Sequence, residues 1–344
     1  MLYGRAMRPI SNAIAVAEPN DGRMESRRGG LSDGNEGRLS IRPESAVRSR
    51  GFRICLLSPR LMLCKQVRMM IKDLLVNVAI GVDDDGTLDY ALGLAGAFDA
   101  HAAGIAFAYE AVPPAMLIDD VPPLWIDELR KEAAEAAKAA VGRFDAAARR
   151  AGRTVEARWM AASFVGTADV FGRLARRFDL SVVRQAEPGN NTPAALIIEA
   201  ALFETGRPVV IVPYIHKAGV KLDRIMVCWD GGRCAARAVN DAMPFLARAG
   251  TVEVVMVTER GESDEVPGAD LAQHLARHGV KVAVKQIVAP DAKPADVLLS
   301  HAADSGADFL VMGGFGHSRL REFVLGGVTR SILDTMTVAT LMAH

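Results

Sequence analysis

Residues 309–330 read FLVMGGFGHSRLREFVLGGVTR, and this stretch carries the strongest structural signal in the chain. Its first four residues are apolar and predict a buried strand. The glycines that follow allow the backbone to approach a bound anion closely. A helix that begins near Gly327 would add unpaired N–H groups and the positive end of its dipole. The stretch therefore predicts a strand, a phosphate-binding loop and a helix.

The same alternation of strands and helices runs from residue 73 to the last residues of the chain. Helical segments separate the predicted strands, and the longest of them covers residues 127–150 with apolar positions on one face. Strands alternating with helices indicate parallel sheets covered on both faces. Two successive units of five strands indicate an internal duplication. The expected fold class is α/β, with two tandem five-stranded parallel-sheet sandwiches of Rossmann-like type. The predicted strands lie near residues 74–80, 103–109, 155–160, 180–183, 208–213, 224–229, 252–257, 280–288, 309–312 and 338–342.

Three segments are expected along the chain. Residues 1–69 are rich in Arg, Gly, Ser and Asn without a sustained period, and they are expected to be a disordered basic extension. Residues 70–215 and 216–344 are expected to be the two repeated domains. Charge is divided unevenly along the chain: residues 1–68 carry a net charge of +7, and the remaining residues carry a net charge of −7.

Composition excludes several classes of protein. Of the 344 residues, 50% are hydrophobic and 24% are charged, which is typical of an ordinary globular protein. A body of net −7 is poorly suited to nucleic acid, whose binding depends on neutralising phosphates. No apolar run approaches the roughly 20 residues that a membrane span needs. Four scattered cysteines favour a reducing, cytoplasmic location.

Taken alone, the glycines are a weak signal. The segment lacks the third glycine of a dinucleotide fingerprint, and no Gly-x-x-x-x-Gly-Lys-Ser/Thr loop occurs in the chain. Glycines after a strand can also serve only to let a helix pack closely. Asp230, which ends a predicted strand, can equally be a helix N-cap.

The spacing of Gly313, Gly316 and Gly326 is more specific. It follows Gly-x2-Gly-x9-Gly and resembles the nucleotide loop of the universal stress protein family. The resemblance covers roughly residues 70–344, as a tandem two-domain member. It implies a fold of the adenine nucleotide α-hydrolase type, with the two units related by pseudo-twofold symmetry. It also implies ATP with Mg²⁺, or another adenine nucleotide, as the ligand of the C-terminal domain.

The resemblance assigns roles to individual residues. Asp230 would hold the adenine or ribose region, Val257 would contact the base, and Met312 would lie near the nucleotide. His317 could pair with phosphate charge. The loop residues that would surround the ribose and phosphates are Gly313, Gly316, Gly326, Gly327, Val328 and Thr329.

Two departures from the family pattern matter. Gly327 stands where the pattern has Ser or Thr, so a hydroxyl bond to phosphate of about 1 kcal/mol is lost. In the first domain, residues 184–192 read RQAEPGNNT and lack the glycine spacing, although Asp83 follows the first strand. The first domain is therefore expected to have lost its nucleotide loop and to serve as a partner of the second, as in family dimers.

Other candidate sites have plainer explanations. His274 and His278 are one helical turn apart and could bind a metal, but a solvated helix face is favoured because no third ligand accompanies them. Cys228 is expected to be a buried structural thiol. The carboxylates of residues 83–85 could hold Mg²⁺, but an acidic turn before a helix is favoured.

The expected function is that of a cytoplasmic, nucleotide-responsive regulator that binds neither nucleic acid nor membranes. Pairing is expected within the chain or in a homodimer. No catalytic residues are identified, since no Gly-x-Ser-x-Gly follows a strand and no general base is evident. Two alternatives remain open. One is a ligand-free tandem scaffold that binds other proteins, and the other is a slow nucleotide hydrolase.

Overall fold

The computed structural model describes residues 14–16, 70–82, 86–110, 123–187, 193–259, 268–315 and 327–344. The described residues from Met70 onward belong to one compact unit. Apart from residues 14–16, the expected extension of residues 1–69 lies outside these ranges. Those three residues form β1 (Ile14–Val16), which pairs antiparallel with β9 (Val282–Val288).

The predicted alternation of strands and helices is confirmed. The N-terminal half contains β2 (Asp73–Asn77), α1 (Gly86–Phe98), β3 (His101–Glu110), α2 (Pro123–Arg150), β4 (Glu156–Ser163), α3 (Gly166–Ala175), β5 (Leu180–Arg184), α4 (Ala194–Phe203) and β6 (Val209–Val212). The C-terminal half contains β7 (Arg224–Cys228), α5 (Arg233–Leu246), β8 (Thr251–Thr258), α6 (Ala269–Arg277), β9, α7 (Pro294–Ser305), β10 (Phe309–Gly313), α8 (Gly327–Thr335) and β11 (Thr340–Ala343). The long helix begins at Pro123 rather than near residue 127, because proline costs no hydrogen bond at a first helical position. None of the helices in the described ranges has both the length and the apolar character needed to cross a bilayer.

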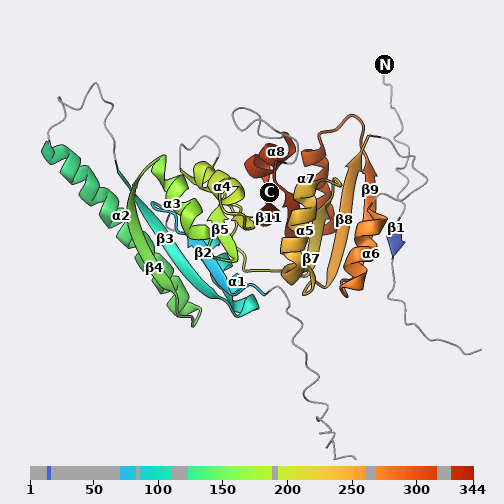
Figure 1. The fold of residues 1–344 in the computed structure, drawn as a ribbon, viewed down its shortest axis with the longest axis horizontal. Coiled ribbons are helices and arrows are strands. Elements are labelled where there is room, and N and C mark those ends of the chain that lie inside the picture. Colours follow the sequence, from blue (N-terminus) through green and yellow to red (C-terminus); the bar gives the residue numbers. More distant parts are fainter. Residues whose placement is uncertain are drawn as a thin grey trace, which may run out of the picture. The chain divides into compact units, whose positions relative to one another are not determined.

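All strands in the described ranges belong to one sheet, in the order β1-β9-β8-β7-β10-β11-β6-β5-β2-β3-β4 (Figure 1). Each half has its own strands in the order third, second, first, fourth, fifth, and the neighbours within a half are parallel. The halves are joined by β6 and β11, which pair antiparallel. The two expected sheets are thus continuous with each other.

The pairing of β6 with β11 has the register of a pseudo-twofold axis. The first residue after the fourth strand of each half donates its N–H to the last residue of the fifth strand, Gln185 to Val212 and Gly314 to Ala343, both at 2.8 Å. Counting back two residues from these acceptors makes Val210 the counterpart of Leu341. Since Val210 and Leu341 are themselves register partners, equivalent positions of the two halves face each other at the junction.

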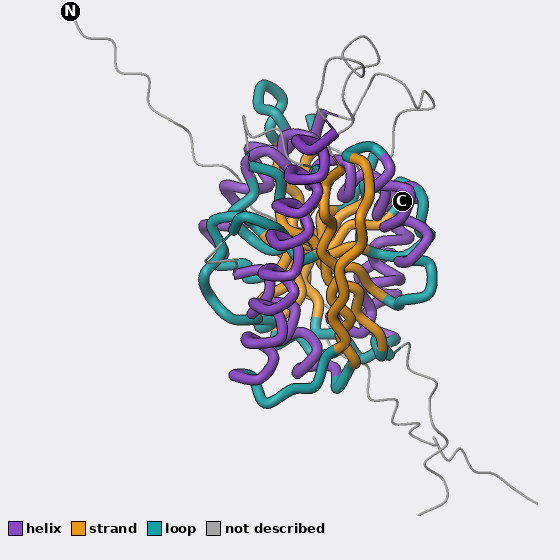
Figure 2. The backbone as a smooth tube through the Cα atoms, turned by 90° about the vertical axis from the view of Figure 1, so that its left-hand side faces the viewer, coloured by secondary structure: helices purple, strands orange, loops and turns teal. Residues whose placement is uncertain are grey.

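Helices cover the sheet on both faces (Figure 2). One buried cluster joins the sheet to α1, α2, α5 and α6, and the other joins its opposite face to α3, α4, α7 and α8. All four residues of β6 and all four of β11 are buried, as expected of strands that are covered on both faces. By contrast, most residues of β4, at the outer edge of the N-terminal half, are exposed or half-buried. The core is therefore continuous through the junction.

Aromatic rings connect the two halves on the face covered by α1 and α5. Phe245 stacks on Phe309 with ring centroids 5.0 Å apart, and it contacts Phe98 of the N-terminal half edge-on at 4.8 Å. The guanidinium of Arg248 lies over the Phe98 ring and donates to the carbonyl of Ala97. Phe245 is fully buried, so this contact contributes core packing rather than surface contact.

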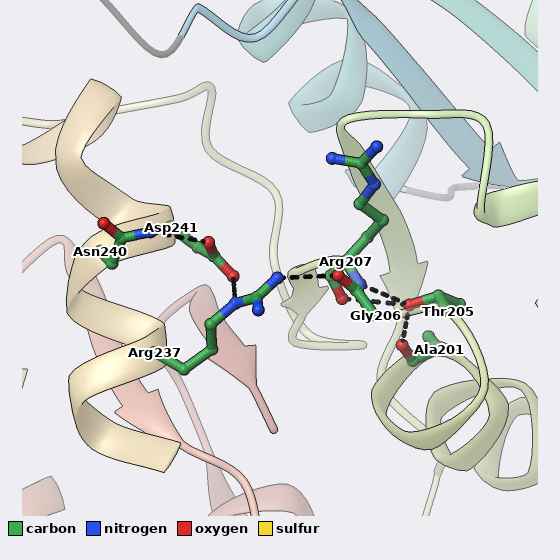
Figure 3. Close-up of polar contacts among 7 residues, drawn as sticks. All are labelled: Ala201, Thr205, Gly206, Arg207, Arg237, Asn240 and Asp241. Atoms are coloured by element: carbon green, nitrogen blue, oxygen red, sulfur yellow. Dashed lines mark hydrogen bonds and ion pairs between the residues drawn. The ribbon is translucent and has the colours of Figure 1, made fainter. Parts of the chain in front are cut away.

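A second connection runs from α5 to the turn before β6 (Figure 3). Arg237 Nη2 donates to the carbonyl oxygen of Gly206 at 2.8 Å, and its Nε donates to the buried carboxylate of Asp241 at 2.7 Å. The turn is held in place by Thr205, whose hydroxyl donates to the carbonyl of Ala201 at 2.6 Å. A single arginine therefore neutralises a buried carboxylate and holds the other half of the molecule.

Replacing Phe245 by alanine is expected to destabilise the whole chain by about 3–5 kcal/mol, because a buried ring that touches both halves is removed. Urea unfolding followed by circular dichroism measures the change. The matched control is Trp125→Ala, in which a largely exposed ring is removed from α2 and the change should stay within about 0.5 kcal/mol. Equal effects of the two substitutions would contradict the packing described.

Candidate functional site

A pocket of about 310 Å³ lies in the C-terminal half at the carboxyl ends of β7, β8 and β10. This is the position at which open parallel sheets bind ligands. Helices α7 and α8 complete its wall. The residues that line it are Cys228, Trp229, Asp230, Val255, Val257, Pro294, Leu298, Met312, Gly313, Gly327, Val328 and Thr329.

Most of the site predicted from the sequence comes together in this pocket. Its lining includes Asp230, Val257, Met312, Gly313, Gly327, Val328 and Thr329. The three other predicted residues, Gly316, His317 and Gly326, lie outside the described residues. Residues from three strand ends and one helix start thus meet around one hollow, although up to about 100 positions separate them in the chain.

Some lining residues were not predicted. Cys228 and Val255 precede Asp230 and Val257 by two positions, and the two-residue period of a strand could have identified them. Pro294 and Leu298, from α7, belong to no motif. Only the packing of α7 on the sheet places them there.

The carboxylate of Asp230 lies at the edge of the pocket in a fixed orientation. Its Oδ1 accepts a hydrogen bond from the N–H of Gly232 at 2.7 Å, across a turn in which Gly231 has φ +73°. The N-cap residue of α5 is Gly232, without a side-chain capping bond. The alternative assignment of Asp230 as a plain helix N-cap is therefore wrong. The turn instead orients the carboxylate beside the pocket.

Cys228 forms part of the pocket floor. Burial, and to a lesser degree the negative charge of Asp230, raises the pKa of the Cys228 thiol to about 12. The side chain is therefore a neutral thiol at physiological pH. The predicted buried thiol is confirmed, and it contributes an uncharged, polarisable surface to the pocket.

The two glycines of the pocket wall have different structural reasons. A Cβ on Gly313 would lie 2.5 Å from the backbone nitrogen of Ala235, so the first turn of α5 occupies the space that a side chain would need. Gly313 is thus explained by close helix packing, which was the alternative to a ligand role. A Cβ on Gly327 would meet nothing within 4 Å, and that position borders open space.

Thr329 links α8 to the end of β10. Its hydroxyl oxygen accepts a hydrogen bond from the N–H of Phe315 at 3.1 Å, and both residues are buried. A hydroxyl that accepts one bond can still donate its own proton. Thr329 therefore connects the strand and helix on either side of residues 316–326 and also lines the pocket.

The corresponding place in the N-terminal half has different side chains. The residue two positions beyond the end of the first strand is Ala79, where the C-terminal half has Asp230; Asp83, the residue predicted there, lies outside the described residues. Ile105 pairs with the last residue of β2 as Val255 does with the last residue of β7, so buried Phe107 is the counterpart of Val257. The fourth strand ends in Arg184, paired with Glu187, where β10 ends in Gly313. The carboxylate and the glycine are thus absent from these positions.

Of the other candidate metal ligands, residues 83–85 lie outside the described residues. The ring centroids of His274, on α6, and of His278, directly after it, lie 4.8 Å apart. No group of three metal-ligating side chains occurs among the residues the structure describes. A larger hollow of about 730 Å³ lies at the amino ends of β2, β3 and β4, where His101 is 3.5 Å from Asp73. It is at the opposite strand ends from the position that ligands use in such sheets.

Comparisons with known proteins agree with the fold and the resemblance. Residues 221–344 match the universal stress protein family. The structure is similar to that of a universal stress protein from Archaeoglobus fulgidus DSM 4304, at 17% identity and a TM-score of 0.60, over 80% of this chain and 98% of that chain. A protein from Pseudomonas aeruginosa UCBPP-PA14, described as a candidate universal stress protein, matches at 16% identity and a TM-score of 0.51, over 79% and 93%.

A comparison with curated protein sequences finds no match. The resemblance to the universal stress protein family is confirmed where the family model applies, in residues 221–344. The likeness to the two solved structures concerns the fold, which extends through the N-terminal half as well.

The two wall glycines give a matched test of the packing. Gly313→Ala is expected to destabilise the ligand-free protein by about 1–3 kcal/mol, since the new methyl group would press on the backbone of α5. Gly327→Ala is expected to be neutral or to stabilise by up to about 1 kcal/mol, because alanine favours the helix and has room. Urea unfolding without nucleotide measures both. A neutral Gly313→Ala would show that packing does not explain this glycine.

Proposed function

We propose that the chain, whose residues 221–344 are a universal stress protein domain, binds one adenine nucleotide in the pocket of its C-terminal half. The observation that carries the proposal is the convergence of three kinds of surface on one hollow: apolar walls, an oriented carboxylate and a helix start. Each suits a different part of a nucleotide. The volume of about 310 Å³ falls at the small end of ordinary ligand pockets.

The apolar part of the pocket suits the base. Val255, Val257, Leu298 and Met312 come from two strands and a helix and give it hydrocarbon and thioether walls. Such walls bind a flat heterocycle by burying its faces. The neutral thiol of Cys228 adds no charge to this surface.

The carboxylate of Asp230 suits the ribose. A carboxylate accepts hydrogen bonds from hydroxyl groups, and an oriented acceptor at a pocket edge discriminates ligands that carry such donors. The hydrogen bond from Gly232 fixes its direction before any ligand arrives. We assign the base to Val257 and the sugar to Asp230, since both residues line the same pocket.

The start of α8 suits the phosphates. Gly327, Val328 and Thr329 form its first turn on the pocket wall. The first N–H groups of a helix have no partner within the helix, and its dipole favours an anion there. No acidic side chain lies in this turn, so nothing in it opposes a phosphate. The missing hydroxyl at Gly327 weakens this contact without removing the backbone donors.

A Mg²⁺ ion would be held mainly by the nucleotide. Magnesium is usually bound through one or two carboxylates together with substrate phosphates and water. Asp230 is the one carboxylate among the described lining residues. Because Asp230 is assigned to the ribose, no second carboxylate in the described lining is left to act as a general base on water. We therefore expect the site to bind nucleotide, with at most slow hydrolysis.

Mg·ATP is expected to raise the thermal stability of the full-length chain, because a ligand at 100 times its Kd adds roughly 2.7 kcal/mol to the free energy of unfolding. Val257→Trp should abolish the shift, since an indole would fill the half-buried wall position beside the base. Calorimetric titration with ATP, ADP, AMP and GTP then gives affinities and the preference for adenine.

The matched control is Val288→Trp. Val288 lies at the carboxyl end of the neighbouring strand β9 and is exposed, but it is not among the residues that line the pocket. This variant should bind Mg·ATP as the wild type does. The proposal is wrong if millimolar Mg·ATP neither shifts the wild-type transition nor gives binding heat, and the ligand-free scaffold then becomes the better account.

A further inference from the structure

We infer that Phe203 and Gln185, both from the N-terminal half, are positioning residues of the nucleotide pocket in the C-terminal half. The inference rests on the proposed function, since it concerns the same pocket. It assigns the N-terminal half a role beyond stability: holding the two chain segments that flank residues 316–326 in the arrangement that receives the ligand.

The first contact holds the end of β10. Phe315 lies two residues beyond the pocket residue Gly313 and has φ +55°, a conformation that aromatic residues adopt only when the surroundings enforce it. Its ring is buried, and its centroid lies 5.1 Å from that of Phe203 at the end of α4. Phe203 also contacts the ring of His344 at 4.8 Å. Phe203, a side chain of the N-terminal half, thus packs against the residue whose backbone follows the end of β10.

The same position is connected directly to the pocket wall. The N–H of Phe315 donates to the hydroxyl of Thr329, which lines the pocket in the first turn of α8. A shift of Phe315 would therefore move the hydrogen-bonding partner of a wall residue. Contact with Phe203 and the position of Thr329 are linked through one backbone amide.

The second contact holds the far end of α8. Gln185 is buried, and its Nε2 donates to the carbonyl oxygen of Leu333 at 2.7 Å. Its Oε1 accepts from the N–H of Tyr214 at 3.2 Å, so both ends of the amide are used. Leu333 lies in the last turn of a helix whose first turn lines the pocket. The N-terminal half therefore restrains the last turn of α8 directly.

The pseudo-twofold relation between the halves shows which position Gln185 occupies. Gln185 and Gly314 are each the first residue after the fourth strand of their half, with the same backbone hydrogen bond to the fifth strand. Gln185 thus stands where the C-terminal half begins its nucleotide loop. The place that lost the glycine spacing now makes an interdomain hydrogen bond.

The test compares nucleotide affinity with stability in the full-length chain. Phe203→Ala is expected to raise the Kd for Mg·ATP about 3- to 10-fold, the factor given by the ordinary contribution of one aromatic pair. Phe203→Tyr keeps the ring and should retain the wild-type Kd. Phe178→Ala is the matched control, because Phe178 is a half-buried aromatic residue of the same core, located at the amino ends of the strands. It should lower the melting temperature and leave the Kd unchanged.

A readout without ligand accompanies the titration. Hydrogen exchange of residues 327–335 should become faster in Phe203→Ala and in Gln185→Ala, and stay at the wild-type rate in Phe178→Ala. If the wild type binds Mg·ATP and Phe203→Ala binds it equally well, the inference is overturned while the proposed function stands. Unchanged exchange in α8 of both variants also overturns it, whatever the affinity. Absence of binding by the wild type overturns the proposed function and this inference with it.

Discussion

The antiparallel pairing of β6 with β11 is the constraint on which the rest of the structure depends. Each is the fifth strand of a five-stranded parallel set, and each would be an exposed edge if its half stood alone. Unpaired edges present rows of unsatisfied N–H and C=O groups and favour aggregation. Joining the two edges removes both, buries every residue of the two strands, and brings equivalent positions of the two halves together.

That junction has the fourth strand of each half, β5 and β10, as the next strand on either side. The carboxyl ends of such parallel strands are where α/β sheets bind ligands. The first two residues after β10, Gly314 and Phe315, pack on α4 of the other half. The first residue after β5, Gln185, donates a hydrogen bond to α8. The two halves thus carry different side chains at corresponding positions. Ala79, Phe107 and Arg184 occupy the positions that Asp230, Val257 and Gly313 have in the C-terminal half.

Much of this could be predicted from the sequence, because it depends on local patterns. Apolar runs and helical periodicity predicted the order of elements. Asp230, Val257 and Gly313, at or near the ends of predicted strands, indicated much of the described pocket lining. The rest depends on which distant surfaces meet. The continuous apolar run of β6 predicts burial on both faces but does not identify β11 as its neighbour. Local patterns could not show that α5 explains Gly313, that α7 supplies Leu298, or that Phe203 supports Phe315.

We propose that the duplicated fold keeps one nucleotide site and uses its other half to hold that site. Native mass spectrometry of the full-length chain, titrated with Mg·ATP, counts the ligands on each chain directly. We expect saturation at one nucleotide per chain. Saturation at two would show that the N-terminal half retains a site despite Phe107 and Arg184, and a spectrum without bound nucleotide would show that the pocket is not a nucleotide site.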